Sequence, residues 1–124
     1  MRNDCFLNKS IKVIEQSILE YECQKKYDMA FTFGVLIHIN PCELVSVYSK
    51  LYESSSKYIM LCKYYSPYPV KINYRGNENK LFKRDFAGEI MQTYSVLKLV
   101  DYGFVYHNDN NFPDDDFTWF LMQK

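Results

Sequence analysis

One segment in the first third of the chain constrains the fold more than any other. Residues 29–33 form a continuous apolar, β-favouring run, which predicts a strand covered on both faces inside a parallel sheet. After a short turn, Asn40 is suited to cap a helix, Pro41 suits the first helical position and Glu43 stands where a capping-box acid would stand. A strand that leads into a capped helix is half of an α/β ligand site.

The following residues complete a strand–helix–strand unit. Apolar side chains recur at helical spacing until a serine run at 54–56, and a second buried strand is predicted over 58–62. A helix between two strands of one sheet requires the strands to run parallel, with a right-handed crossover. The helical stripe consists of Leu44, Val47, Tyr48 and Leu51.

The remaining segments give weaker signals. Residues 1–10 are polar and unpatterned, and residues 11–14 predict a short strand that ends in a loop near Ser17. Two prolines exclude a helix from the basic, tyrosine-rich stretch 63–83, which predicts a binding loop or lid. The last predicted elements are a helix over 85–94 and two strands, over 96–107 and 118–122, that form an antiparallel hairpin with a long polar tip.

Composition excludes several classes of protein. The formal net charge is zero and the pI is about 6.7, so no overall field attracts the chain to nucleic acid or to a membrane surface. We find neither an apolar run of about 18 residues nor a secretory leader pattern, and we therefore expect a cytoplasmic protein. Four cysteines lack the spacing of a zinc site or a disulfide scaffold and are expected to be reduced packing residues: Cys5, Cys23, Cys42 and Cys62.

Several longer motifs occur in a consistent order. They are DMAFTFGVLIHINP at 28–41, YYSPYP at 64–69, RG at 75–76, KLFKRDFAGE at 80–89, VDYGFVYH at 100–107, FP at 112–113 and TWFL at 118–121. Together they resemble the pseudaminic acid biosynthesis-associated methylase family over about residues 11–124. The order of elements resembles the C-terminal half of a class I S-adenosylmethionine-dependent methyltransferase. The resemblance implies one partial α/β, Rossmann-like domain, N-terminally truncated, with parallel strands followed by an antiparallel hairpin and with 1–10 as a polar extension.

The chain departs from the family pattern at three places. Lys63 stands where members carry an acid, and Gln16 stands where they carry glycine. The glycine-rich turn and the ribose-binding acid that hold the cofactor in the family are absent from the sequence. The resemblance implies that the strand at 29–33 has an unpaired edge, which invites association. We expect a partner there, either a separate chain that supplies the missing half or a second copy.

The resemblance also implies roles for individual residues. His38, where the strand passes into the helix, is a candidate general base, and a hydrogen-bonded helix-entry histidine is the alternative. Ser17 and Ile18 would lie beside the adenine of S-adenosylmethionine. Phe31, Thr32 and Gly34 would form the floor beneath the methyl donor, and the alternative is that they fill the core.

The basic stretch predicts an acceptor site. Residues 71–84 carry five cations against one acid, and Arg grips carboxylate or phosphate bidentately, whereas a solvated basic loop is the alternative. We expect no nucleic acid partner and no metal, with the acids at 114–116 solvated. The expected activity is methyl transfer to a sugar or sugar-acid acceptor; the alternative is a non-catalytic binding or assembly module. The predicted substrate contacts are Tyr65, Tyr74, Arg75, Lys83 and Arg84.

Overall fold

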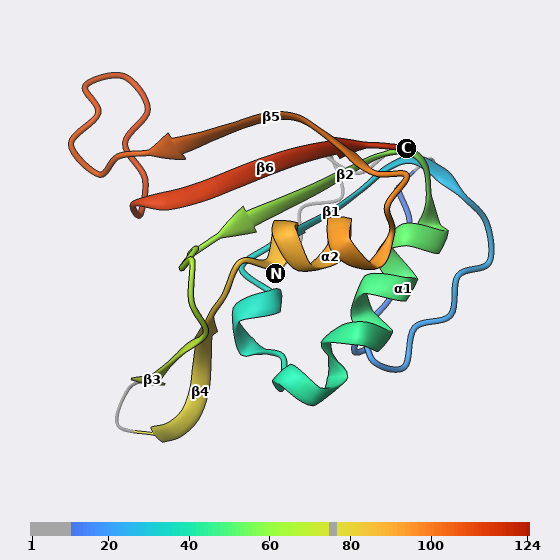
Figure 1. Cartoon of the computed structure of the whole chain (residues 1–124), viewed down its shortest axis with the longest axis horizontal. Coiled ribbons are helices and arrows are strands. Elements are labelled where there is room, and N and C mark those ends of the chain that lie inside the picture. Colours follow the sequence, from blue (N-terminus) through green and yellow to red (C-terminus); the bar gives the residue numbers. More distant parts are fainter. Residues whose placement is uncertain (1–10, 75–76) are drawn as a thin grey trace.

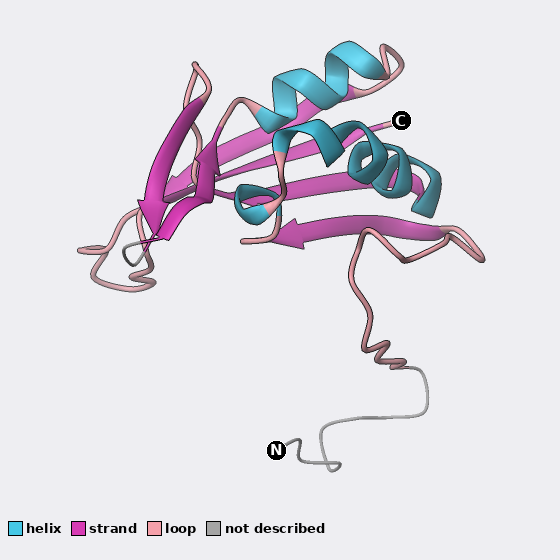
Figure 2. Ribbon diagram, turned by 90° about the horizontal axis from the view of Figure 1, so that it is seen from below, coloured by secondary structure: helices cyan, strands magenta, loops and turns pink. Residues whose placement is uncertain are grey.

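The computed structural model describes residues 11–74 and 77–124 (Figure 1). Its elements are β1 (Tyr27–Phe33), the 3-10 helices η2 (Leu36–His38) and η3 (Pro41–Glu43), α1 (Leu44–Ser54), β2 (Ser55–Lys63), β3 (Val70–Tyr74), β4 (Asn77–Lys83), α2 (Phe86–Thr93), β5 (Lys98–Val105) and β6 (Phe117–Gln123). A four-stranded sheet has the order β1-β2-β6-β5, and β3 and β4 form a separate pair. Figures 1 and 2 show α1 and α2 on the same side of the larger sheet.

The predicted strand–helix–strand unit is confirmed. Strands β1 and β2 run parallel, with Phe31 opposite Met60. The side chain of Asn40 accepts a hydrogen bond of 3.2 Å from the backbone N–H of Cys42, although the capped turn is η3 and α1 begins only at Leu44. The four apolar residues of the predicted stripe are buried against the sheet.

The core lies between the two helices and one face of the sheet. Val47 and Ile90 from the helices are fully buried with Ile59 and Met122 from the strands beneath them. At the end of α1, the ammonium group of Lys124 donates hydrogen bonds of 2.5 Å to the carbonyl oxygens of two residues, Tyr52 and Ser55. A cation there complements the negative end of the helix dipole.

The prediction that residues 29–33 are covered on both faces is wrong. Ala30 and Thr32 lie on the side of the core, whereas Phe31 is 63% exposed, with Met29 and Phe33 on the same open face. Strand β1 is also an edge strand of the sheet. In this chain the continuous apolar run forms a strand with only one covered face, because both described helices pack on the same side of the sheet (Figures 1 and 2).

Two further predictions about local structure are wrong. Residues 11–14 form no strand and their side chains are exposed, because no described strand offers hydrogen bonds to their backbone. The stretch 63–83 is not a continuous loop: β3 and β4 pair antiparallel, with Ile72 opposite Leu81, and this hairpin projects beyond the end of β2 (Figure 1). Both prolines precede β3, so they leave its hydrogen bonds intact.

The predicted helix near 85–94 and the terminal hairpin are confirmed. The carboxylate of Asp85 accepts a hydrogen bond of 2.9 Å from the backbone N–H of Gly88 and so caps α2. Strands β5 and β6 pair antiparallel. Strand β5 runs through Gly103. The indole of Trp119 leaves no room for a side chain there, because a Cβ at this position would be 2.7 Å from the indole nitrogen.

Candidate functional site at the carboxyl ends of the parallel strands

The carboxyl ends of β1 and β2 meet at the same edge of the sheet, where ligands bind in open α/β folds. Two unusual backbone conformations occur there: Gly34 has a φ of 71° and Lys63 has a φ of 137°. Positive φ is rare outside glycine, and such strain is concentrated at functional sites. The edge therefore combines the expected ligand position with a strained backbone.

A narrow cavity lies beside this edge, beneath the start of α2. Its volume is about 20 Å³, which is enough for a water molecule and too small for an adenosyl group. The residues that line it come from η2, the end of β2, α2 and β6: Leu36, Ile37, Leu61, Cys62, Lys63, Tyr64, Tyr65, Arg84, Phe86, Ala87 and Phe120.

Arg84 also borders a larger groove, of about 220 Å³, between η3 and the β3–β4 hairpin. Its other lining residues are Pro41, Pro69, Val70, Lys71 and Phe82. A larger hollow, of about 940 Å³, is bordered by residues between Lys12 and Tyr27. It lies at the amino end of β1, away from the edge where ligands bind.

The ammonium group of Lys63 lies over aromatic rings at the mouth of the cavity. Its Nζ atom is 5.1 Å from the ring centre of Phe33 and 5.2 Å from that of Phe117. It is also 5.2 Å from the ring centre of Tyr64. Contacts of this kind attract a cation through the ring quadrupole. The side chain of Lys63 is thereby held at the sheet edge, with only 16% of its surface exposed.

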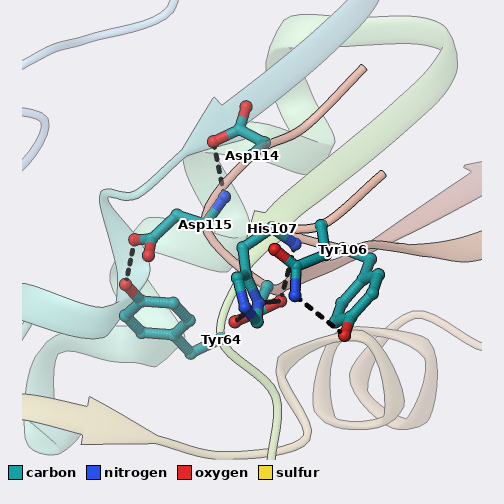
Figure 3. A network of polar contacts seen from close by, with 7 residues as sticks. Tyr64, Tyr106, His107, Asp114 and Asp115 are labelled. Carbon is teal, nitrogen blue, oxygen red and sulfur yellow. Dashed lines mark hydrogen bonds and ion pairs between the residues drawn. The ribbon is translucent and has the colours of Figure 1, made fainter. Parts of the chain in front are cut away.

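Asp115, from the loop between β5 and β6, completes this cluster. Its Oδ2 atom accepts a hydrogen bond from the Tyr64 hydroxyl (Figure 3) and also lies 3.4 Å from the Lys63 ammonium. The hydrogen bond from Tyr64, followed by that from Lys63, holds the pKa of Asp115 below its usual range. Asp115 is exposed, as predicted for the acids at 114–116, but its pairing with Tyr64 and Lys63 was not predicted.

The neighbouring acid, Asp116, makes a second anchor for the same loop. Both of its carboxylate oxygens lie 2.9 Å from Nδ1 of His107, at the other end of the loop (Figure 3). This contact lowers the pKa of Asp116. The side chains of this pair are about half exposed, so the contact lies at the surface of the protein.

A polar network joins the two helices behind the cavity. The Nε atom of Arg84 donates a 2.8 Å hydrogen bond to Glu89, and the Tyr48 hydroxyl donates another of 2.8 Å to the same carboxylate. Burial, reinforced by the bond to Glu89, raises the pKa of Tyr48 above its usual range. Glu89 thus fixes one nitrogen of Arg84 and ties α1 to α2.

Three of the predicted substrate residues come together at this edge. The backbone of Tyr65 pairs with that of Arg84, and the Tyr65 ring centre is 5.7 Å from that of Phe120. The Lys83 ammonium is 5.0 Å from the ring centre of Tyr64. The side chain of Tyr74 and the whole of Arg75 lie outside the described residues, so their roles stay predictions.

The predicted cofactor residues are not brought together. Ser17 and Ile18 form a turn beside α1, where Lys50 donates a 2.6 Å hydrogen bond to the carbonyl oxygen of Leu19. Ile18 packs against the core, whereas Phe31 points to the open face of the sheet. Thr32 is more buried than either residue, at 6% exposure, and its hydroxyl has no hydrogen-bond partner within the described part of the chain.

His38 lies close to this edge, at the end of η2. Its side chain is exposed, and its backbone N–H donates a 3.0 Å hydrogen bond to the carbonyl oxygen of Val35. Gly34 precedes η2, and a Cβ there would meet only the Lys63 side chain, at 3.8 Å. The positive φ of Gly34, rather than lack of space, therefore explains the glycine.

The cavity at the sheet edge has a volume of about 20 Å³, which holds little more than a water molecule. Within 11–74 and 77–124, no group of three or more His, Cys, Asp or Glu side chains is placed to hold a metal ion. The three cysteines within the described residues are free thiols, and one of them, Cys42, is exposed rather than packed; Cys5 lies outside the described residues. The described helices include none that is long and apolar enough to span a membrane.

Comparison with known proteins decides the fold. No family model and no curated protein matches the sequence. The structure is similar to that of 1,6-didemethyltoxoflavin-N1-methyltransferase from Burkholderia thailandensis with bound S-adenosylhomocysteine, with a TM-score of 0.69 and 11% identity over 90% of this chain and 49% of that one. The chain has a class I methyltransferase fold.

Two other solved structures agree on this methyltransferase fold. Magnesium protoporphyrin IX methyltransferase from Synechocystis PCC 6803 with bound S-adenosylmethionine has a TM-score of 0.60 and 13% identity, over 90% of this chain and 44% of that one. An S-adenosylmethionine-dependent methyltransferase from Leishmania major has a TM-score of 0.59 and 13% identity, over 87% of this chain and 42% of that one. The chain spans about half the length of the structures it matches.

Two residues of the site, Lys63 and Asp115, are not identified as site residues by the sequence. The sequence shows Lys63 only as a departure from the family pattern, and it predicts a solvated Asp115. The presence of Lys63 where the family carries an acid could have indicated the site, because a cation at the end of a buried strand needs an anionic or aromatic partner nearby.

Proposed function

We propose that this chain is the acceptor-side part of a S-adenosylmethionine-dependent methyltransferase that acts on a sugar or sugar-acid acceptor in the biosynthesis of pseudaminic acid or a surface glycan. The likeness of 90% of the chain to a methyltransferase, at a TM-score of 0.69, is the observation that supports this most strongly. The acceptor class is supported by the sequence motifs and by the cations at the sheet edge, Lys63, Lys83 and Arg84.

In this proposal the protein contributes position rather than covalent chemistry. The cofactor, when bound, supplies an activated methyl group, and the protein aligns the acceptor atom behind it for in-line displacement. Arg84 and Lys83 hold the acceptor, and His38 removes the proton of its hydroxyl. Gly34, at the carboxyl end of β1, forms the part of the floor that this chain provides, because Phe31 and Thr32 lie on opposite faces of the strand.

A companion completes the cofactor site in this proposal. The edge of β1 has no described partner strand, and the face that carries Met29, Phe31 and Phe33 is uncovered in the described residues. Exposed strand edges and apolar faces favour association. The companion is a separate polypeptide with the glycine-rich turn, and a second copy of this chain is the other arrangement.

Co-expression tests this function. The chain, tagged and expressed with the adjacent reading frames of its natural locus, is expected to co-purify with a polypeptide that carries a G-x-G-type turn. The complex is expected to bind S-adenosylhomocysteine with a Kd below about 10 μM and to transfer radiolabelled methyl groups to nonulosonic acids. A stable complex that does neither would contradict the proposal.

The uncovered apolar face also favours a second candidate, a non-catalytic assembly module derived from a methyltransferase. In that case β1 recruits a partner without forming a cofactor site. An adjacent reading frame that encodes a glycine-rich turn would support the methyltransferase function over the assembly module. A chain that self-associates through β1, and that has no such frame beside it, supports the assembly module.

A further inference from the structure

One cation at the sheet edge has no carboxylate partner among the described contacts. Lys63 and Arg84 line the cavity and pair with Asp115 and Glu89, respectively. Lys83 contacts the ring of Tyr64 and no described carboxylate. Its ammonium group is therefore available to contact an anion.

Donors at this edge already converge on one oxygen atom. The Tyr64 hydroxyl and the Lys63 ammonium both donate to Oδ2 of Asp115, while the Lys83 ammonium lies over the same Tyr64 ring. Convergent charged donors of this kind are the usual way in which proteins hold carboxylate and phosphate oxygens. Asp115 therefore marks where an oxyanion is held.

Asp115 is loosely held compared with the donors that face it. Its side chain is 63% exposed, on the loop between two hairpin strands, whereas Lys63 is 16% exposed and is fixed over aromatic rings. An exposed ion pair contributes little free energy, so another anion can displace it. Arg84 is bound through Nε alone in the described contacts, which leaves its terminal nitrogens for a ligand.

We propose that Lys63, Tyr64, Lys83 and Arg84 form a binding site for an oxyanion group, a phosphate or a carboxylate, and that Asp115 occupies this site as an internal substitute until a ligand displaces it. Displacement frees the loop at 106–116 from its contact with the sheet edge. The identification of this oxyanion with a group of the methyl acceptor rests on the proposed function; oxyanion binding itself does not.

The test is a titration of the full ¹⁵N-labelled chain with sodium phosphate, and separately with sodium acetate, at constant ionic strength. Saturable shifts are expected at the amides of Tyr64 and Asp115, with a Kd on the order of millimolar. Asp115→Asn removes the internal competitor and is expected to lower the Kd about 3- to 10-fold. If phosphate binds more tightly, the natural group is a phosphate; if acetate does, it is a carboxylate.

Matched variants separate this site from a general charge effect. Asp109→Asn removes the same charge from the same loop, where Asp109 accepts bonds only from backbone N–H groups, and is expected to change the Kd less than about 2-fold. Lys83→Met is expected to raise the Kd at least about 3-fold. The dispersion of the spectrum reports whether each variant folds, and the comparison of the two aspartate variants stands without Lys83→Met.

Two results would overturn the proposal. One is the absence of saturable shifts up to about 50 mM phosphate or acetate in both the natural chain and Asp115→Asn. The other is an equal gain in affinity from Asp109→Asn and Asp115→Asn. Neither cofactor nor companion is present in this titration, so its failure leaves the methyltransferase proposal intact, and failure of methyl transfer leaves the oxyanion site intact.

Discussion

The two faces of the larger sheet differ although they are built from the same strands. On the side of α1 and α2, Ile59 and Met122 are fully buried. On the opposite side, Phe31 is 63% exposed and Met29 is 43% exposed. Alternate residues of one strand thus belong to a finished core and to an uncovered surface. The stability of the chain comes from one face, and the other face is available for association.

The largest effect is expected from removing a side chain of the covered face. Ile59→Ala deletes buried methyl groups and leaves a cavity, so it is expected to lower the free energy of unfolding by about 2–5 kcal/mol. Phe31→Ala on the open face is the control, with a loss below about 1 kcal/mol. Urea denaturation measures both. Similar losses would show that the open face is covered in solution.

A smaller loss is expected at the end of the covered layer. Lys124→Met removes charge-assisted hydrogen bonds to the carbonyl oxygens of Tyr52 and Ser55, and is expected to cost about 1.5–3 kcal/mol. Lys57→Met is the control, because Lys57 is exposed over the ring of Tyr58, and its loss is expected to stay within about 0.5 kcal/mol. Equal losses in the same denaturation experiment would refute the capping role.

A change of opposite sign is expected where β1 meets the core. The buried Thr32 hydroxyl has no described hydrogen-bond partner, so Thr32→Val removes a desolvated polar group at nearly constant volume. The free energy of unfolding is expected to rise by about 1 kcal/mol. Thermal or urea unfolding provides the measurement, and a loss of stability would show that the hydroxyl has a partner in solution.

The smallest effect is expected from acid. The lowered pKa values of Asp115 and Asp116 mean that the folded state favours their ionised forms. Their contribution is therefore present above the ordinary aspartate pKa, about 4, and is lost as pH falls toward the lowered folded values. A double variant, Asp115→Asn with Asp116→Asn, should have a flatter decline in its urea midpoint between about pH 5 and pH 2. An unchanged decline would contradict these loop anchors.

Local patterns predicted the covered face well. The stripe of Leu44, Val47, Tyr48 and Leu51 has the period of a helix, and the parallel pairing of β1 and β2 follows from the helix between them. The antiparallel pairing of β5 with β6 follows from the polar tip that joins them. These features depend on residues close in sequence, so the sequence alone was sufficient.

Features that depend on distant residues were not predictable in this way. The apolar run at 29–33 does not indicate whether helices cover one face of the strand or both, and it therefore predicted that both faces lie in the core. The prolines before β3 predicted a loop, whereas the residues that follow them alternate and form the β3–β4 hairpin. The contact between Lys63 and Asp115 joins residues 52 positions apart, which no local pattern records.

Calorimetric titration of the isolated full chain with S-adenosylhomocysteine tests most directly whether the cofactor site needs a companion. The sequence has no glycine-rich turn, and the cavity at the sheet edge is about 20 Å³. We predict no saturable binding tighter than a Kd of about 10 μM, roughly −7 kcal/mol. Saturable binding tighter than this value by the chain alone would contradict the need for a companion half.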